Sequence, residues 1–259
     1  MLELQAVSGG YDGIERIKEI SLSFGDSGIV SIIGPNGCGK STLLKILANL
    51  LKPMSGKALL DGRDIRQIGR LEYAKRVSFL PQVRSIPNMS VSSLVMHGRH
   101  PYLSYPRRYG AADKRIGEEA MELTGAIAYQ HRNVQSLSGG ERQKAYIAMS
   151  VAQDTDVMLM DEPTTYLDVQ HQYEIMELAK KLRKRGKLII LVLHDLNLAM
   201  NYSDRMVIMD KGRVLAWEAP ATLYQTGIID KVFHIRTELI RFEGGYQLLF
   251  LPSMKEENT

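Results

Sequence analysis

Cysteine is nearly missing from this sequence, since Cys38 is the single one among 259 residues. One cysteine excludes an internal disulfide and is typical of a protein kept in a reducing compartment. Long apolar runs are missing too: the longest, LIILVL at 188–193, is far shorter than the roughly 18 to 20 residues of a membrane-spanning helix. Internal repeats, heptad arrays and low-complexity segments are also absent. We therefore expect a globular protein without a membrane span.

A strong charge imbalance is absent as well. The net charge is only +4, from 33 Lys and Arg against 29 Asp and Glu. This small excess suits an anionic ligand or a membrane surface and indicates no particular partner. The first residues, MLELQAV, carry an acid at position 3 and lack a charged leader before an apolar stretch, so we expect no cleaved signal.

Strand patterns of two kinds are present. Apolar and polar residues alternate at 2–7 and 19–24, which is typical of half-buried antiparallel strands. The runs IVSII, VMLM and LIILVL are nearly all apolar, which is typical of strands covered on both faces in a parallel sheet. Each run is followed by a helical pattern, in which apolar residues recur every three or four positions. Strands that alternate with helices predict an α/β core.

The pattern changes between about residues 88 and 155, where strand-type runs stop and helical patterns take over. Core strands are expected on both sides of this segment. We therefore interpret 88–155 as a helical subdomain inserted into a single domain that spans 1–259. Near the end of the chain, the pattern at 236–251 predicts a β-hairpin with Gly244 and Gly245 at its turn.

The segment IVSIIGPNGCGKST carries the strongest chemical signal. Gly34, four residues and then Gly39-Lys40-Ser41 match the phosphate-loop pattern, with an apolar strand before it and a helical pattern after it. Glycines allow backbone amides to converge on a phosphate, and the helix N-terminus adds a favourable dipole. Lys40 is expected to meet the β- and γ-phosphates, and the Ser41 hydroxyl to bind Mg²⁺. The glycine spacing does not fit the dinucleotide-binding fingerprint.

An acidic pair follows the second apolar run, in VMLMDEP. Asp161 and Glu162 stand at the carboxyl end of a buried strand, where open α/β sheets bind ligands. Adjacent carboxylates there are costly unless they face cations, hydrogen-bond donors or water, and a solvated pair of acids is the alternative. Beside a phosphate loop, Asp161 fits a contact to the hydration shell of Mg²⁺. Glu162 fits the base that orients and activates water.

The stretch LSGGE at 137–141 begins a helical pattern with two glycines. Ser138 stands three residues before Glu141, which is the spacing of a capping box. Gly139 and Gly140 each cost about 1 kcal/mol in a helix relative to alanine. Their missing β-carbons allow backbone amides to approach an anion closely, so we expect a second phosphate contact here.

The order of these motifs resembles that of the ATP-binding subunit of an ABC transporter, over essentially the whole chain, and LSGGE matches the family signature. The resemblance implies a P-loop NTPase (RecA-like) core with an antiparallel β subdomain, a helical insertion and a C-terminal β-hairpin. It implies ATP and Mg²⁺ as cofactors. It also implies that two copies pair head to tail, so that the signature of one copy faces the ATP on the phosphate loop of the other.

The resemblance also assigns roles to single residues. Tyr11 matches the aromatic residue that stacks on adenine, Gln82 the glutamine that senses Mg²⁺ and the γ-phosphate, and His194 the histidine that holds the γ-phosphate. YLD at 166–168 matches a loop at the contact between copies. The residues implied for catalysis are Glu162, His194 and Gln82. Those implied for the metal are Ser41, Gln82 and Asp161. Those implied for nucleotide contact are Tyr11, Gly34, Pro35, Asn36, Gly37, Cys38, Gly39, Lys40, Ser41, Thr42, Ser138, Gly139, Gly140, Glu141 and Asp168.

A narrower resemblance concerns the cargo. The segments at 92–103 and 151–172 resemble ATPases of importers for ferric siderophores, haem and cobalamin, and AQDTD and TTYLDVQHQ favour the siderophore branch. The implied partners are integral-membrane permease subunits, a second copy of the chain and, indirectly, a substrate-binding protein. The surface around Gln82, with HGRHPY at 97–102, is implied as the permease contact. The implied location is the cytoplasmic face of the cell membrane, as a peripheral protein.

Alternatives remain for the cargo and the direction of transport. Importers of haem, cobalamin or molybdate use the same machinery, and this subunit does not contact the cargo. An exporter ATPase is less favoured. A soluble ABC ATPase outside transport is also less favoured, because the chain has one cassette, no coiled coil and no long basic arm.

Three further features receive plainer interpretations. The basic run KKLRKRGK at 180–187 is interpreted as the solvated end of a helix that stops at Gly186, and we expect no nucleic-acid partner. His97 and His100 lack the further ligands of a metal site. Cys38 is interpreted as a small side chain at a variable position, since a reactive thiol needs exposure and a low pKa.

Overall fold

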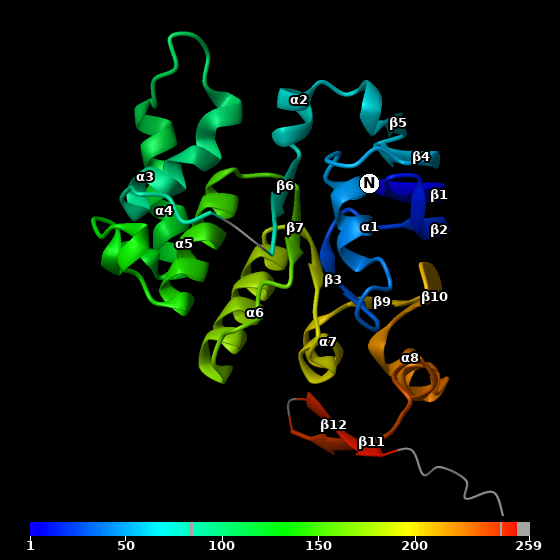
Figure 1. Ribbon diagram of the computed structural model, residues 1–259. Helices are drawn as coiled ribbons and strands as arrows, with labels where there is room; N and C mark the ends of the chain where they lie inside the picture. The colour runs from blue at the N-terminus through cyan, green and yellow to red at the C-terminus, as the bar shows by residue number, and fades with distance from the viewer. Residues whose placement is uncertain (83–84, 244, 253–259) are drawn as a thin grey trace, which may run out of the picture.

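A computed structural model describes residues 1–82, 85–243 and 245–252 (Figure 1). The central sheet and its helices lie in the middle of the molecule, between an antiparallel sheet on one side and helices α3 to α5 on the other. A β-hairpin lies at the foot of the molecule. The strands are β1 Leu2–Tyr11, β2 Ile14–Ser23, β3 Gly28–Ile33, β4 Ser55–Leu60, β5 Arg63–Asp64, β6 Val77–Leu80, β7 Val157–Asp161, β8 Leu188–Val192, β9 Arg205–Asp210, β10 Arg213–Glu218, β11 Ile235–Phe242 and β12 Gly245–Pro252. The α-helices are α1 Lys40–Leu47, α2 Arg70–Ala74, α3 Val91–Met96, α4 Ala111–Thr124, α5 Gly139–Ala152, α6 Val169–Lys184, α7 Leu196–Tyr202, α8 Pro220–Gln225 and α9 Ile228–Phe233.

The central sheet has the strand order β10-β9-β3-β8-β7-β6, and all its neighbours pair in parallel except β9 and β10. Every residue of β3, β7 and β8 is buried. This burial explains why the three runs are apolar without alternation, because helices cover both faces of a parallel sheet. The predicted α/β fold class is confirmed, and the carboxyl ends of β3, β7 and β8 point to one edge of the sheet.

The antiparallel sheet has the order β2-β1-β4-β5. Its first two strands are longer than the alternation at 2–7 and 19–24 predicts. The pairing of β1 with β2 shifts register between Leu4 and Val7 and again near Gly9. Ala6 and Glu19 both have positive φ, at 46° and 48°. Because a bulge interrupts the two-residue period of side-chain direction, the strands continue past the point where the alternation ends.

The helical insertion leaves the central sheet after β6 and returns at β7, the parallel strand next to β6. Its helices α3, α4 and α5 pack on one another through buried apolar side chains such as Val95, Met121 and Ala148. The insertion predicted in the fold class is thus present, while its boundaries as a subdomain, 88–155, stay a prediction.

The C-terminal hairpin pairs β11 with β12 from Ile235 opposite Pro252 to Phe242 opposite Gly245. Gly244, the other glycine predicted at the turn, lies outside the described residues. Helix α7 anchors the hairpin, since the backbone N–H of Leu248 donates to Asn197 Oδ1 at 2.6 Å. Two strands alone are marginally stable in water, so this docking is needed for the hairpin to persist.

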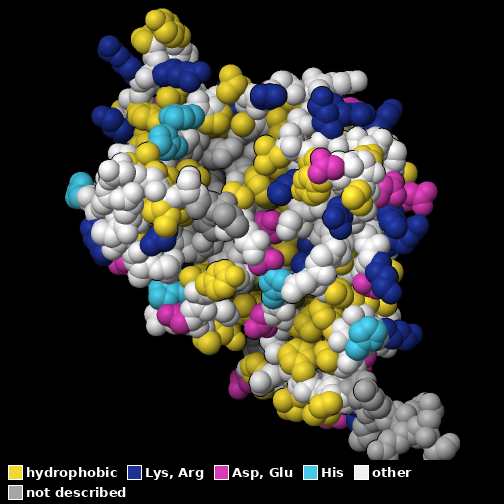
Figure 2. All heavy atoms as spheres, in the orientation of Figure 1, with side chains coloured by type: hydrophobic (Ala, Val, Ile, Leu, Met, Phe, Trp, Pro, Cys, Tyr) yellow, Lys and Arg dark blue, Asp and Glu magenta, His cyan; other side chains and the backbone are white. Residues whose placement is uncertain are grey.

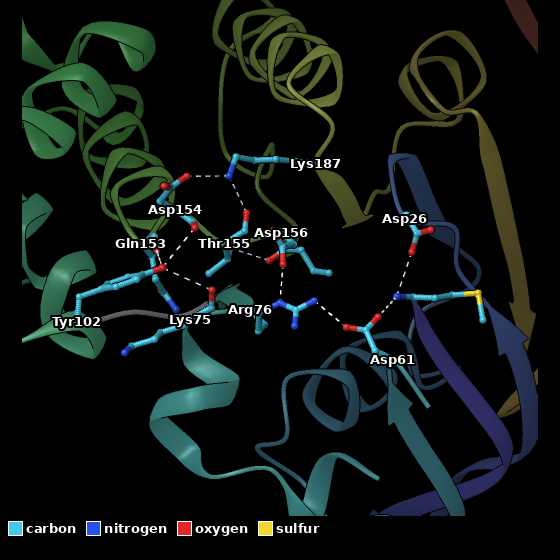
Figure 3. A network of polar contacts seen from close by, with 12 residues as sticks. Asp26, Asp61, Lys75, Arg76, Tyr102, Gln153, Asp154, Thr155, Asp156 and Lys187 are labelled. Atoms are coloured by element: carbon cyan, nitrogen blue, oxygen red, sulfur yellow. Dashed lines mark hydrogen bonds and ion pairs between the residues drawn. The ribbon is translucent and has the colours of Figure 1, made fainter. Parts of the chain in front are cut away.

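A network of polar contacts joins the subdomains at the start of β6 (Figure 3). The Arg76 guanidinium pairs with Asp61, just after β4, at 2.7 Å, and with Asp156, just before β7, at 2.5 Å. The Tyr102 hydroxyl donates to the Gln153 carbonyl at 2.9 Å, within the helical insertion. The same hydroxyl lies 3.5 Å from the Lys75 carbonyl oxygen. The antiparallel sheet, the central sheet and the insertion are therefore tied together where β6 begins.

Two other sequence features can be located. The basic run at 180–187 covers the last turn of α6 and the three residues after it, and Gly186, with φ 81°, follows the helix end as a left-handed cap. Among the described residues, no helix combines the length and the apolar character required to cross a bilayer.

Candidate active site

The loop between β3 and α1 depends on its glycines. A β-carbon on Gly39, which has φ 106°, would lie 2.6 Å from Ile17 Cγ2 and 2.7 Å from the Arg16 carbonyl oxygen. A β-carbon on Gly34 would lie 2.1 Å from the Met209 carbonyl oxygen. Only glycine fits at both places, and the loop can therefore close tightly at the N-terminus of α1.

Lys40 is the first residue of α1, and its side chain turns back over the loop. Its ammonium nitrogen donates to the Gly34 carbonyl at 2.8 Å and to the Pro35 carbonyl at 3.0 Å. The residue is only 5% exposed, yet it lines the cavity above the loop. An ammonium has three protons, so one is left to reach an anion in that cavity.

This cavity, the phosphate pocket, has a volume of about 360 Å³. Tyr11 stands at its rim, half exposed, with the Lys45 ammonium 5.4 Å from the centre of its ring. Arg16 also lines the pocket and adds positive charge, although no motif in the sequence predicted it. The lining residues are Tyr11, Arg16, Asn36, Gly37, Gly39, Lys40, Ser41, Thr42 and Glu162.

Cys38 is part of the loop, but its side chain is buried below it. Burial raises the pKa of the Cys38 thiol, and the nearby Lys40 charge only partly opposes this. Because a thiol with a raised pKa and little exposure is a poor nucleophile, the plain interpretation of Cys38 is supported.

Ser41 and Asp161, which are 120 positions apart, meet at the pocket, where the Ser41 hydroxyl donates to Asp161 Oδ1 at 3.1 Å. Asp161 is 4% exposed, and burial raises its pKa. A buried carboxylate beside a hydroxyl supplies the hard oxygen ligands that Mg²⁺ prefers, and a cation there would offset the cost of burial. These two residues therefore fit a magnesium ion.

Glu162 is held by three side chains. Its Oε1 lies 2.6 Å from His194 Nε2, and its Oε2 accepts from Gln82 Nε2 at 2.5 Å and from Thr165 Oγ1 at 3.1 Å. The chain turns sharply at Glu162, where φ is 52°. Thr165 was not predicted from the sequence. The structure thus brings Glu162, His194 and Gln82 together at the edge of the phosphate pocket.

The signature segment forms the start of α5, and Ser138 and Glu141 form the expected capping box. Glu141 N–H donates to Ser138 Oγ at 3.3 Å, and Ser138 N–H donates to Glu141 Oε2 at 2.9 Å. The bond from the Ser138 backbone is the main cause that lowers the pKa of Glu141. A second carboxylate contact, at 2.9 Å, comes from Arg132.

The two glycines of this segment differ in their surroundings. A β-carbon on Gly140 would lie 2.8 Å from Cδ2 of the His171 ring, so a side chain there would have to displace that ring. A β-carbon on Gly139 would have no neighbour within 4 Å among the described residues. Gly139 therefore borders open space, and it lines a cavity of about 200 Å³ together with Gln82 and Glu162.

Asp168 lies at the N-cap of α6. Its Oδ1 accepts from the His171 backbone N–H at 2.9 Å and lies 2.6 Å from His171 Nδ1. The backbone bond is the main cause that lowers the pKa of Asp168. Nearby Tyr166 is 95% exposed and has φ 63°. This loop projects outward from the molecule.

Comparisons with known proteins agree with this geometry. The family model described as "ABC transporter" matches residues 17–165, more than half of the chain. The chain belongs to the ABC transporter family. It is 40% identical to the achromobactin transport ATP-binding protein CbrD of Dickeya dadantii, over 96% of this chain and 93% of the relative. It is 42% identical to the petrobactin import ATP-binding protein FpuC of Bacillus anthracis, over 86% of this chain and 82% of the relative.

A solved structure gives a further comparison. An ATP-binding cassette described as dimeric, in a post-hydrolysis state bound to ADP and Pi, matches with a TM-score of 0.74 and 28% identity, over 85% of this chain and 99% of that one. As an ABC ATPase, the present chain binds and hydrolyses ATP, and the P-loop NTPase fold class is confirmed.

The residues assigned to the site fall into two groups in this ABC ATPase. The first group lies in or beside the phosphate pocket: Tyr11, Gly34, Pro35, Asn36, Gly37, Cys38, Gly39, Lys40, Ser41, Thr42, Gln82, Asp161, Glu162 and His194. The second group does not line the pocket: Ser138, Gly139, Gly140, Glu141 and Asp168. The roles of both groups stay predictions.

Proposed function

We propose that this protein is the ATP-hydrolysing subunit of an importer for iron–siderophore-type substrates. The observation that carries the ATPase site is the position of Glu162. It lines the phosphate pocket together with Lys40 and is held there by His194 and Gln82. The likeness to two siderophore-transport ATP-binding proteins supports the cargo class.

Phosphate binding rests on the loop and on two cations. Backbone amides at the N-terminus of α1 and the Lys40 ammonium bind the β- and γ-phosphates, and Arg16 adds charge at the pocket wall. Tyr11, at the rim, stacks on the adenine ring. Ser41, Asp161 and Gln82 would hold Mg²⁺, which would neutralise charge on the phosphates.

Glu162 is the base that activates the attacking water. The carboxylate accepts a proton from the water that attacks the γ-phosphate, and the contacts from Gln82 and Thr165 fix its orientation. His194 lies within hydrogen-bond distance of the other carboxylate oxygen and is half exposed toward the pocket edge. It bridges the base and the γ-phosphate.

The second group of residues acts on another molecule's nucleotide. Ser138 to Glu141 begin a helix whose amides suit an anion, yet they do not line the phosphate pocket of their own chain. The open space at Gly139 supports the approach of a ligand from outside. Two copies therefore pair head to tail, and the Asp168 loop lies at their contact.

The membrane partner is a permease, and this subunit binds to it at the cytoplasmic face. The segment His97–Tyr102 is a 3₁₀ helix in the helical insertion. Arg99 is buried and paired with Asp113 at 3.1 Å, and the Tyr102 hydroxyl also turns inward. His100 remains exposed, stacked on Tyr109, and is the part of the segment available to the permease.

The test is reconstitution with the permease that co-purifies from membranes. In liposomes, a binding protein loaded with a ferric siderophore should stimulate ATP hydrolysis and uptake of labelled iron, and Glu162→Gln should abolish both. Stimulation by a binding protein loaded with haem, cobalamin or molybdate would instead assign the cargo to that class. A co-purifying permease that works without a binding protein would favour export.

A further inference from the structure

The C-terminal hairpin has an apolar face that nothing in the described chain covers. Residues paired across an antiparallel ladder project on the same side. Ile240, Phe242, Leu249 and Leu251 share one side by this register, and they are 45%, 56%, 39% and 37% exposed. The opposite side holds the buried Leu248 against α7. Figure 2 shows hydrophobic side chains gathered at the foot of the molecule, where Figure 1 places β11 and β12.

This outer face continues onto helix α6. Phe242, at the end of β11, lines a cavity of about 430 Å³ together with Val169 and Tyr173. Val169 is 68% exposed and Tyr173 is 49% exposed. Val169 directly follows Asp168, the end of the loop that we assign to the contact between copies. Polar side chains, among them Lys180, Asp195 and Gln247, also line this cavity. We call Val169, Tyr173, Ile240, Phe242, Leu249 and Leu251, which extend from that loop across the cavity to the hairpin, the hairpin surface.

The charges on the outer face suit a second copy of the chain. Arg236 and Glu238 are its two charged residues by register, and they pair with each other at 2.8 Å. A surface that meets its own copy across a two-fold axis brings identical residues close together, so unpaired charge would repel. A surface that binds anionic lipid would instead present unpaired Lys and Arg around its apolar side chains.

We propose that the hairpin surface packs against the second copy in the ATPase dimer and extends the contact made by the loop at 166–168. This inference rests on the head-to-tail pairing proposed above. The hairpin surface lies apart from the phosphate pocket, and it therefore contributes to association of the two copies without contacting nucleotide.

The experiment measures dimer formation of the full chain in a Glu162→Gln background with ATP and Mg²⁺, by sedimentation equilibrium. Adding Ile240→Glu and Phe242→Glu should raise the dimer dissociation constant at least about tenfold, because interface cores tolerate buried charge poorly. Nucleotide affinity of the monomer should not change. Leu71→Glu, at another exposed apolar residue, is the matched control and should leave dimer formation unchanged. Phe242→Ser is a milder variant if the double change unfolds the hairpin, with an expected weakening in the same direction.

The outcomes distinguish a failure of the hairpin contact from a failure of the head-to-tail pairing. If Glu162→Gln alone does not dimerise with ATP, the head-to-tail pairing is wrong. If it dimerises and the hairpin variants dimerise equally well, the pairing stands and the hairpin surface is not part of it. Loss of binding to the permease or to anionic vesicles, with unchanged dimerisation, would likewise overturn the proposal and assign the surface to that other partner.

Discussion

Two helix starts in this molecule carry glycines and suit an anion, but they differ in what surrounds them. At the start of α1, one chain supplies Lys40, Ser41, Asp161 and Glu162 around a defined pocket. At the start of α5, the chain supplies a capping box and an open space at Gly139, beside a smaller cavity of about 200 Å³ whose lining does not include Lys40 or Ser41. We expect the first start to be a complete phosphate site within one chain. We expect the second to offer its donors to a nucleotide held by another molecule.

The largest expected effect concerns the complete site. Glu162→Gln should slow ATP hydrolysis at least about 100-fold, because a general base contributes roughly 10²- to 10⁴-fold. ATP should still bind, since Lys40 and the loop are unchanged. Steady-state hydrolysis and equilibrium nucleotide binding measure the two quantities separately. Near-normal turnover would show that Glu162 is not the base.

Lys40→Ala should weaken the binding of ATP to the same site. Charge-assisted hydrogen bonds contribute about 1.5–3 kcal/mol, so the ATP dissociation constant of the monomer should rise about 10- to 100-fold. Fluorescent-nucleotide titration of the isolated subunit measures this change. Lys45→Ala keeps the loop and removes a cation that lies beside Tyr11 and also acts on Asp161. It serves as the control and should have a smaller effect. An unchanged dissociation constant for Lys40→Ala would contradict the phosphate-loop assignment.

The smallest effects concern the second helix start. Gly139→Ala should stabilise α5, by about 0.5–1 kcal/mol, because alanine is the better helix residue and space is free around this position. It should nevertheless slow hydrolysis by the assembled transporter, since the methyl group occupies the approach to the amides. Thermal melting and ATPase assays test the two halves.

Gly140→Ala sharpens this prediction as a matched variant. Its β-carbon would meet the His171 ring at 2.8 Å, so the gain in helix propensity should be offset by that contact. If Gly139→Ala left hydrolysis unchanged, the open space at Gly139 would have no role in nucleotide contact.

Much of this architecture was predictable because its signals are local. Continuous apolar runs predicted β3, β7 and β8, and the phosphate-loop pattern predicted the loop before α1. The lengths of β1 and β2 were not predictable from alternation, because the bulges near Ala6 break the two-residue period. The order of the strands in the central sheet could not be predicted either, since pairing between distant segments produces no local sequence pattern.

The residues of the candidate site were likewise predictable only where they belong to a sequence pattern. The motifs placed Ser41 with Asp161, and Glu162 with Gln82 and His194, because each belongs to a recognisable pattern. Arg16 and Thr165 were missed, since an arginine in a strand or a threonine in a loop gains its role only when the chain folds around the pocket. The contact between Gly140 and His171 was likewise not visible in the sequence.

The central claim is that each active site is shared by two copies, and mixing two inactive variants tests it most directly. Lys40→Ala damages the phosphate pocket, and Ser138→Arg blocks the signature segment without touching the pocket of its own chain. If the sites are shared head to tail, a mixed dimer has one site with both defects and one intact site. An equal mixture in assembled transporters should then recover about a quarter of the wild-type hydrolysis rate, since about half of the dimers are mixed. At an ATP concentration near the wild-type dissociation constant, both variants alone should be nearly inactive. A mixture as inactive as its two components would contradict the shared site.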